Sequence, residues 1–322
     1  MINDIDIRAI VPADADGLAA CIRRCYGESY PKRIMYEPSV LAEQIRTRSY
    51  KGVVATAGSD VVGHIWFNWP NPAASVVEAG TTIVDARYRG EGLMGRLALV
   101  LRDNIIADGA FGFVHFPTTA HTVMQKASVQ AGGCETGVML AFLPPAARDL
   151  LIGGSGEDRL AVTVVYQPLI EAPTHSIYMP DRYHDLIADF ADRLQLRRIL
   201  GRAFEKPIGK TIVRSTADKH RKLERLTVEY IGEDIAEIIV SATKETDATL
   251  IHVDLGMYQP QIHDAVEALR EAGFAFSAWL PHWNKSDVLR LQFLKNSTVG
   301  ERHPTLHSNA ANEIAALIRS EL

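Results

Sequence analysis

Residues 83 to 100 constrain the fold more than any other stretch of the chain. They read Ile-Val-Asp-Ala-Arg-Tyr-Arg-Gly-Glu-Gly-Leu-Met-Gly-Arg-Leu-Ala-Leu-Val. An apolar, β-branched run ends at Asp85, and Leu93, Leu97 and Leu101 then follow at helical spacing. The stretch therefore predicts a strand, a short loop and a helix.

The loop between this strand and this helix is suited to bind phosphate. Gly90 and Gly92 allow the backbone to come close to a ligand. The helix that follows directs its free N–H groups and the positive end of its dipole towards the loop. Such donors can replace the water around a phosphate group at little cost in reorganisation. The alternative interpretation is an ordinary surface turn rich in Arg and Gly.

Length and composition exclude several classes of protein. A chain of 322 residues exceeds what one core usually serves, so two domains are expected. The net charge of -5 provides no general attraction to nucleic acid or anionic lipid, so neither is an expected partner. The chain start lacks the features of a signal peptide, and no run approaches about 18 apolar residues. We therefore expect a cytoplasmic protein. Its three cysteines form no metal-ligand pattern, and no metal is expected.

The two halves of the chain share a pattern. Phe142-Leu-Pro144 followed by Asp158-Arg-Leu160 is echoed by Trp279-Leu-Pro281 followed by Asp287-Val-Leu289. Between residues 238 and 254 the second half has a polar segment where the first half has its glycine loop and helix. We predict that one fold is present twice, in domains of residues 1–170 and 171–322. The second is expected to lack a pyrophosphate site and to end in an amphipathic helix.

The residues Arg87-x-x-Gly90-x-Gly92, placed between the predicted fourth strand and its helix, resemble the acyl-CoA loop of the GCN5-related N-acetyltransferase (GNAT) family. The predicted order of elements over roughly residues 5–168 also resembles that family's α/β fold. The resemblance implies two tandem GNAT-like domains, a layout known from mycothiol synthase. Each would be an α+β mixed sheet, mostly antiparallel, flanked by helices.

The resemblance also implies acetyl-CoA as co-substrate. Val84, Asp85 and Ala86 would edge the pantetheine arm, and the loop itself would bind the pyrophosphate through its backbone amides. His121 occupies the place of an Asn that the family has near the start of a later helix. The loop and the helix start that would contact the cofactor comprise Arg87, Arg89, Gly90, Glu91, Gly92, Leu93 and Met94.

Two residues are implied as catalytic. GNAT enzymes often carry on the fourth strand a Glu that deprotonates the acceptor amine, and Glu78 lies on that predicted strand. The alternative is a solvent-facing carboxylate. His115 is a rival base, although its echo at His252 favours a structural imidazole. Ser128 stands where the family has a Tyr that protonates the leaving thiolate; because a hydroxyl is a poor proton source, water or unaided departure of the thiolate stay open.

Aromatic residues in the first half are candidates for the wall of an acceptor pocket. They are Tyr26, Tyr30, Tyr36, Trp66, Phe67 and Trp69. A stripe of large apolar residues on a strand is also typical of a core, and that alternative stays open.

The function implied is an acyl-CoA-dependent N-acyltransferase, with an acetyl group moved to a small-molecule amine by direct attack. One alternative is a CoA-binding regulatory or assembly protein whose second copy serves dimerisation or docking. Another is thioester chemistry other than N-acetylation. A homodimer is left open.

Overall fold

The structure is a computed structural model that describes residues 4–28, 30, 32–153, 158–201, 204–295 and 304–322. The chain has the predicted mixed α/β architecture, with mixed sheets flanked by helices. It divides into two compact units, one of residues 1–70 and 76–115 and one of residues 71–75 and 116–322. Within the described residues, no helix combines the length and the apolar character needed to cross a bilayer.

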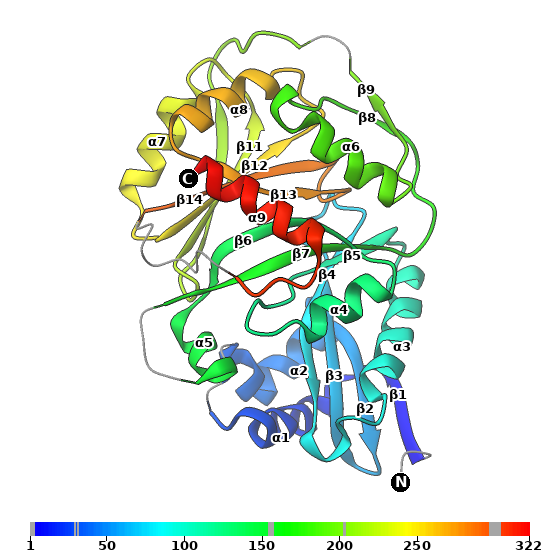
Figure 1. The fold of residues 1–322 in the computed structure, drawn as a ribbon. Coiled ribbons are helices and arrows are strands. Elements are labelled where there is room, and N and C mark those ends of the chain that lie inside the picture. Colours follow the sequence, from blue (N-terminus) through cyan, green and yellow to red (C-terminus); the bar gives the residue numbers. More distant parts are fainter. Residues whose placement is uncertain (1–3, 29, 31, 154–157, 202–203, 296–303) are drawn as a thin grey trace. The chain divides into compact units, whose positions relative to one another are not determined.

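The sheet of the first unit has the strand order β1-β2-β3-β4-β5 (Figure 1). Neighbouring strands are antiparallel except for β4 and β5, which are parallel. Strands β2 and β3 form a hairpin that turns at Gly58. The strands are β1 (Ile5–Ala9), β2 (Lys51–Ala57), β3 (Asp60–Asn68), β4 (Val77–Val84) and β5 (Gly112–His115).

Helices cover both faces of this sheet (Figure 1). Helices α1 and α2 bury Leu18 and Leu41 in one apolar cluster with Val54 of β2. Helix α3 packs on the opposite face, where a Cβ at Gly63 would lie 2.8 Å from Cδ1 of Leu97. The helical elements are the 3-10 turns Pro12–Asp14, Arg33–Tyr36 and Ala86–Tyr88 with α1 (Ala15–Tyr26), α2 (Pro38–Arg46) and α3 (Leu93–Ala107).

The second unit has a larger mixed sheet with the order β7-β6-β13-β14-β12-β11-β10, and a separate parallel pair, β8 and β9. Its strands are β6 (Cys134–Leu143), β7 (Leu160–Pro168), β8 (His175–Ile177), β9 (Arg198–Leu200), β10 (Ile212–Asp218), β11 (Leu223–Tyr230), β12 (Leu250–Gly256), β13 (Ala275–Leu280) and β14 (Val288–Leu294). Its helices are α4 (Val123–Gln130), α5 (Pro145–Ile152), the 3-10 turn Asp181–Tyr183, α6 (His184–Arg193), α7 (Ile235–Glu245), α8 (Ile262–Glu271) and α9 (Asn309–Glu321).

The succession of elements repeats along the chain. The series β10, β11, α7, β12, α8, β13, β14 has the same order as β3, β4, α3, β5, α4, β6, β7, apart from the inserted α5. The corresponding strands β6 and β13 pair with each other at Gly137 and Ala278. A Cβ at Gly137 would lie only 2.4 Å from that of Ala278, so this contact requires glycine.

The β6–β13 pairing groups residues 116–170 with the second unit. The compact units therefore change over at His115, whereas the pattern of the sequence places the domain boundary at residue 170. Helix α9 strengthens the grouping, since it packs on both β6 and β13. Glu321 near its end accepts hydrogen bonds from the Tyr183 hydroxyl (3.0 Å) and the Phe276 N–H (2.7 Å). The independence of a 1–170 domain stays a prediction.

Candidate functional site

Strands β4 and β5 separate at their carboxyl ends. Their pairing runs only from Val77↔Phe113 to Ala79↔His115, whereas β4 continues to Val84. The register between β3 and β4 shifts at this point by a bulge, which bends β4. The last residues of β4 therefore present a strand edge that β5 does not cover. In open α/β sheets, ligands bind beyond the carboxyl ends of such parallel strands.

The loop that follows β4 has the backbone that its glycines predict. Gly90 has φ +79° and Gly92 has φ +76°, both in the left-handed region that glycine adopts without strain. A Cβ at either position would meet no atom within 4 Å. These glycines are therefore required by backbone conformation and not by lack of space, and the outer face of the loop is open.

Helix α3 begins directly after this loop and has an open N-terminus. Its N-cap residue, Gly92, provides no side-chain cap. The backbone bond from the Arg96 N–H to the Gly92 carbonyl (3.2 Å) marks the start of the helical ladder. The N–H groups of the first turn lie ahead of that bond and have no acceptor within the helix. The predicted strand, loop and helix thus place donors and a positive dipole end beside the free edge of β4.

The two arginines of the loop fold back onto the end of β4. Asp85 is 3% exposed, and its carboxylate accepts bonds from the Arg87 N–H (3.1 Å) and guanidinium (2.8 Å). Arg24 of α1 donates to the same carboxylate (2.8 Å), and these bonds hold the pKa of Asp85 well below its usual range. Arg89 donates to the Val84 carbonyl (3.0 Å). Arg87 and Arg89, predicted as cofactor-binding residues, thus shape the loop while its backbone faces outwards.

Glu78 lies on β4 one residue before the strands separate. It is half-buried and stands opposite Asn68 of β3. Directly paired residues share a face of the sheet, and Asn68 and Trp66 share theirs because side chains alternate along a strand. Since Trp66 packs against the cluster under α1 and α2, Glu78 is directed to that same face.

The aromatic residues proposed for an acceptor wall divide between core and surface. Tyr26, Tyr30, Tyr36 and Trp66 are only partly buried against the α1 and α2 cluster. Phe67 is buried and alternates to the opposite face of β3, so it serves as a core residue. The partly buried members lie on the face that carries Glu78.

Of the two histidines of the echoed strands, His252 is fully buried and His115 is half-buried, and the protein interior favours the neutral form of both rings. Burial lowers the pKa of His115 to about 4, and its Nε2 has no hydrogen-bond partner within the described residues. Burial also lowers the pKa of His252 well below its ordinary value, and its ring stacks on Phe142. A shared place and a shared environment favour the structural interpretation for both imidazoles.

The predicted residues of the second unit are His121 and Ser128. His121 is exposed just before α4, and its carbonyl accepts a bond from the Gln125 side chain (3.2 Å). Ser128 is buried within α4, and its hydroxyl donates to the Met124 carbonyl (2.6 Å). In this geometry the Ser128 proton is engaged within its own helix, which weakens its candidacy as the acid that protonates a leaving thiolate.

The repeated elements of the second unit differ at the equivalent place. Strands β11 and β12 stay paired from Leu223↔Leu250 to Val228↔Leu255 and do not separate. The sequence-based expectation that this half lacks the helix is wrong, because α7 is present. The β-branched residues of α7 give only a weak helical signal in the sequence, because such residues are weak helix formers.

A segment of the unit's own chain closes the start of α7. The Gly232 N–H donates to the Thr211 hydroxyl (3.1 Å), and the Glu233 N–H donates to the Gly209 carbonyl (3.1 Å). Asp234 accepts a bond from the Thr211 N–H (2.7 Å) and adds a negative charge beside the helix start. The N–H groups of Gly232 and Glu233, in the loop just before α7, are thus engaged by the chain itself. The Asp234 carboxylate, which also pairs with Lys210 (3.2 Å), occupies the place where an anion would approach the helix start. This arrangement supports the prediction that the second copy has no pyrophosphate site.

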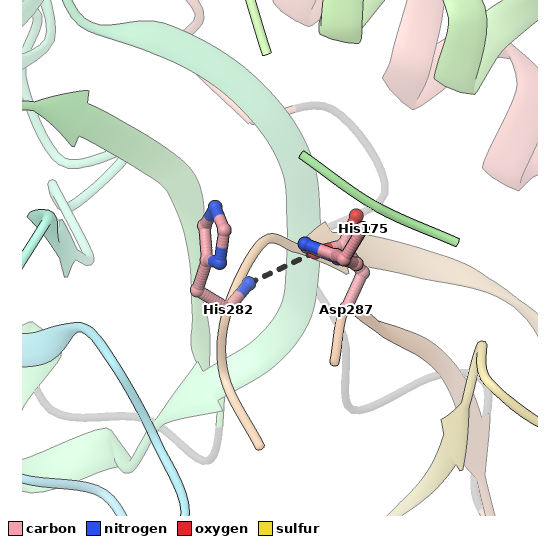
Figure 2. Close-up of side chains that lie close together, drawn as sticks. All are labelled: His175, His282 and Asp287. Atoms are coloured by element: carbon pink, nitrogen blue, oxygen red, sulfur yellow. Dashed lines mark hydrogen bonds and ion pairs between the residues drawn. The ribbon is translucent and has the colours of Figure 1, made fainter. Parts of the chain in front are cut away.

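A second group of polar residues in this unit has the composition of a metal site (Figure 2). One ligand atom from each of His175, His282 and Asp287 lies within 4.8 Å of the others. However, Arg198 donates to both oxygens of Asp287 (2.8 and 3.1 Å), and Trp279 also donates to this carboxylate (3.2 Å). The cation paired with Asp287 is therefore a guanidinium, and we interpret the group as a structural ion pair.

The sequence did not single out this group, because its members come from separate elements. Arg198 lies on β9, far along the chain from Asp287. Figure 2 shows that the His282 backbone, and not its ring, is directed to Asp287. The His282 N–H donates a hydrogen bond to the Asp287 carboxylate (3.0 Å). The spacing of these residues along the sequence therefore does not predict that they lie together.

Comparisons with known proteins returned similar folds only. No family model and no curated protein matches the chain. Similar solved structures include an N-acetyltransferase from Staphylococcus aureus Mu50, with 16% identity, TM-score 0.41, and coverage of 51% of this chain and 98% of that one. A putative acetyltransferase from Salmonella typhimurium, with acetyl-CoA, has 16% identity, TM-score 0.42, and coverage of 52% and 96%.

A third structure is a GNAT superfamily phosphinothricin acetyltransferase from Sinorhizobium meliloti, in complex with acetyl-CoA. It has 19% identity, TM-score 0.41, and coverage of 52% of this chain and 90% of that one.

Proposed function

We propose that this protein is an N-acyltransferase that uses acetyl-CoA and a small-molecule amine. The observation that carries the proposal is the open N-terminus of α3, which follows two left-handed glycines and lies beside the uncovered edge of β4. An anion with a long, amide-containing arm fits these two features together. Phosphate groups suit the helix start, and an extended amide suits a free strand edge.

The residues present have the chemistry that such an acyl donor requires. The backbone N–H groups from Gly90 to Met94 would hold the pyrophosphate, with Leu93 buried as the anchor of the helix start. The end of β4 up to Val84 would pair with the pantetheine amides. Bound acetyl-CoA would supply an activated thioester, and the remaining chemistry would be performed by residues of this chain.

The transfer itself requires a neutral amine. Glu78 would take the amine proton, directly or through water, while the new C–N bond forms and the C–S bond breaks. The thiolate would then take a proton from water, because the Ser128 proton is engaged with Met124. The hydroxide left behind would take the proton held by Glu78, which returns the carboxylate to its starting state. The place of Glu78 just before the strands separate supports its role as base.

One molecule of acetyl-CoA is expected to bind per chain. The open helix start of α3 can accept a pyrophosphate, whereas that of α7 is closed by Gly209–Thr211 and Asp234. Isothermal titration of the purified protein with acetyl-CoA measures the stoichiometry directly. The absence of both heat and a thermal shift would contradict the proposal, and a stoichiometry of about two would contradict the closure of the second copy.

Glu78→Gln is expected to lower kcat for amine-dependent thiol release by about a hundredfold, because a general base typically contributes at least that much. The Kd for acetyl-CoA should stay unchanged, since the loop is intact. The residual rate should rise with pH as more of the amine becomes neutral. Glu43→Gln, which removes an exposed carboxylate from α2 outside the proposed site, is the matched control. Equal rates for wild type and Glu78→Gln would remove Glu78 from the mechanism.

A second candidate function is favoured by the Ser128 geometry. With its proton engaged in the helix, the chain could bind CoA without transferring an acyl group. This version predicts a thermal shift with acetyl-CoA and no free thiol across a panel of amines, amino acids and sugars. Mass spectrometry of any acyl product separates N-acetylation from other thioester chemistry.

A further inference from the structure

Asp85 creates an electrostatic problem beside the proposed pyrophosphate site. Its buried carboxylate stands at the end of β4, where the loop begins, and it caps the turn through the Arg87 N–H. It is ionised, since its hydrogen bonds from Arg87 and Arg24 lower its pKa. A lone negative charge here would repel a pyrophosphate. Asp85 and Arg87 by themselves form a pair without net charge, and the exposed Asp60 also lies 4.0 Å from the Arg87 guanidinium.

Arg24 resolves this problem from outside the loop. It lies on α1, and its Nε donates to Oδ2 of Asp85 (2.8 Å) while its Nη2 donates to the Val61 carbonyl (2.6 Å). The guanidinium is thus held at two points, the end of β4 and the neighbouring strand β3. With Arg24 and Arg87 both bound to Asp85, the group carries a net charge of +1 (two guanidinium groups minus one carboxylate).

We propose that Arg24 is a positioning residue for the acyl donor, which keeps the base of the loop positive and so favours the pyrophosphate. This inference rests on the proposed function. Its chemistry is specific to the charged part of the donor. The thioester and pantetheine arm would lie along β4 and carry no charge for Arg24 to act on.

Two acyl donors, acetyl-CoA and acetyl-pantetheine, test whether Arg24 acts on the pyrophosphate. Arg24→Gln should raise the KM for acetyl-CoA about tenfold, the order expected for one charge acting through a partly solvated site, and leave kcat within about twofold. The KM for acetyl-pantetheine, which lacks the phosphates, should not change. Arg23→Gln is the matched control, because it removes the same charge from the residue that precedes Arg24 on α1. The Arg23 side chain is 46% exposed and pairs with Glu28.

The charge balance supplies a second test. Arg24→Gln combined with Asp85→Asn restores the net charge of +1, so the KM for acetyl-CoA should return towards the wild-type value. Arg24→Lys keeps the charge, so its KM for acetyl-CoA should also stay near the wild-type value. This variant is measured in place of Arg24→Gln if Arg24→Gln does not fold. A tenfold rise in KM for acetyl-CoA in Arg24→Lys would overturn the inference.

Three further outcomes would overturn the inference. The first is an equal rise in KM for acetyl-CoA and for acetyl-pantetheine in Arg24→Gln. The second is a rise in the KM for acetyl-CoA in Arg23→Gln as large as that in Arg24→Gln. The third is an unchanged KM for acetyl-CoA in Arg24→Gln. Failure of the wild-type protein to bind acetyl-CoA in calorimetry would overturn the proposed function as well. That result is distinguishable, because it appears before any variant is compared.

Discussion

Gly92→Val is expected to raise the Kd for acetyl-CoA by about a hundredfold, equivalent to about 2.7 kcal/mol, while the protein stays folded. Gly92 has φ +76°, a conformation that a β-branched residue adopts only with strain. A Cβ there meets no neighbour within 4 Å, so the substitution acts through backbone strain and not through a side-chain clash, and we expect the loop to relax to another backbone conformation. That relaxation would turn the N–H groups of the α3 start away from the ligand. Isothermal titration measures the loss.

The matched control for Gly92→Val is Gly58→Val. Gly58 lies in the β2–β3 turn with φ +61°, and a Cβ at this position would also meet no atom within 4 Å. The same substitution in the same kind of backbone should cost similar stability and leave acetyl-CoA binding unchanged. If Gly92→Val binds acetyl-CoA as tightly as the wild type, the loop is not the pyrophosphate site.

Asp287→Asn is expected to lower the free energy of unfolding of the second unit by about 3–5 kcal/mol. The Arg198 side chain is only 2% exposed and pairs with Asp287 through two bonds. The neutral amide would leave this guanidinium buried without its counter-charge. It would also present an NH₂ group to donors such as the Trp279 ring N–H. Urea unfolding followed by tryptophan fluorescence, to which Trp279 and Trp283 contribute, measures the change.

Glu267→Gln is the control for that experiment. Glu267 also pairs with an arginine of the second unit, Arg182, but the two side chains are 39% and 40% exposed. Its loss should cost less than about 1 kcal/mol, as is usual for exposed pairs. Zn²⁺ should not stabilise the wild type. Stabilisation by Zn²⁺ that Asp287→Asn lacks would show that His175, His282 and Asp287 form a metal site after all.

The strand, loop and helix from Ile83 to Ala107 were readable in the sequence because their causes are local. The leucines recur at helical spacing, and the glycines adopt left-handed backbone conformations. Both effects depend on only a few neighbouring residues. The echoed residues Trp279-Leu-Pro281 and Asp287-Val-Leu289 lie at the end of β13 and the start of β14, so the repeated order of elements was also readable from local patterns. Helix α7 was missed, since its β-branched residues gave no clear helical preference.

The partners of charged residues were not readable. Arg24 and Asp85 are 61 residues apart, and Arg198 and Asp287 are 89 residues apart. The closure of the α7 start by Gly209–Thr211 joins segments that no sequence period relates. The pairing of β6 with β13 has the same character, because it depends on two strands meeting at Gly137 and Ala278.

The sequence by itself determined where a phosphate-binding loop can form, because backbone conformation at Gly90 and Gly92 is a property of the residues themselves. Only the tertiary structure decided that this loop stays open while its counterpart is closed. It also decided that Arg87 and Arg89 fold back onto β4 and that Arg24 completes the charge of the site. The physical reason is that hydrogen bonds and ion pairs depend on distances in space, which the fold sets and residue spacing does not.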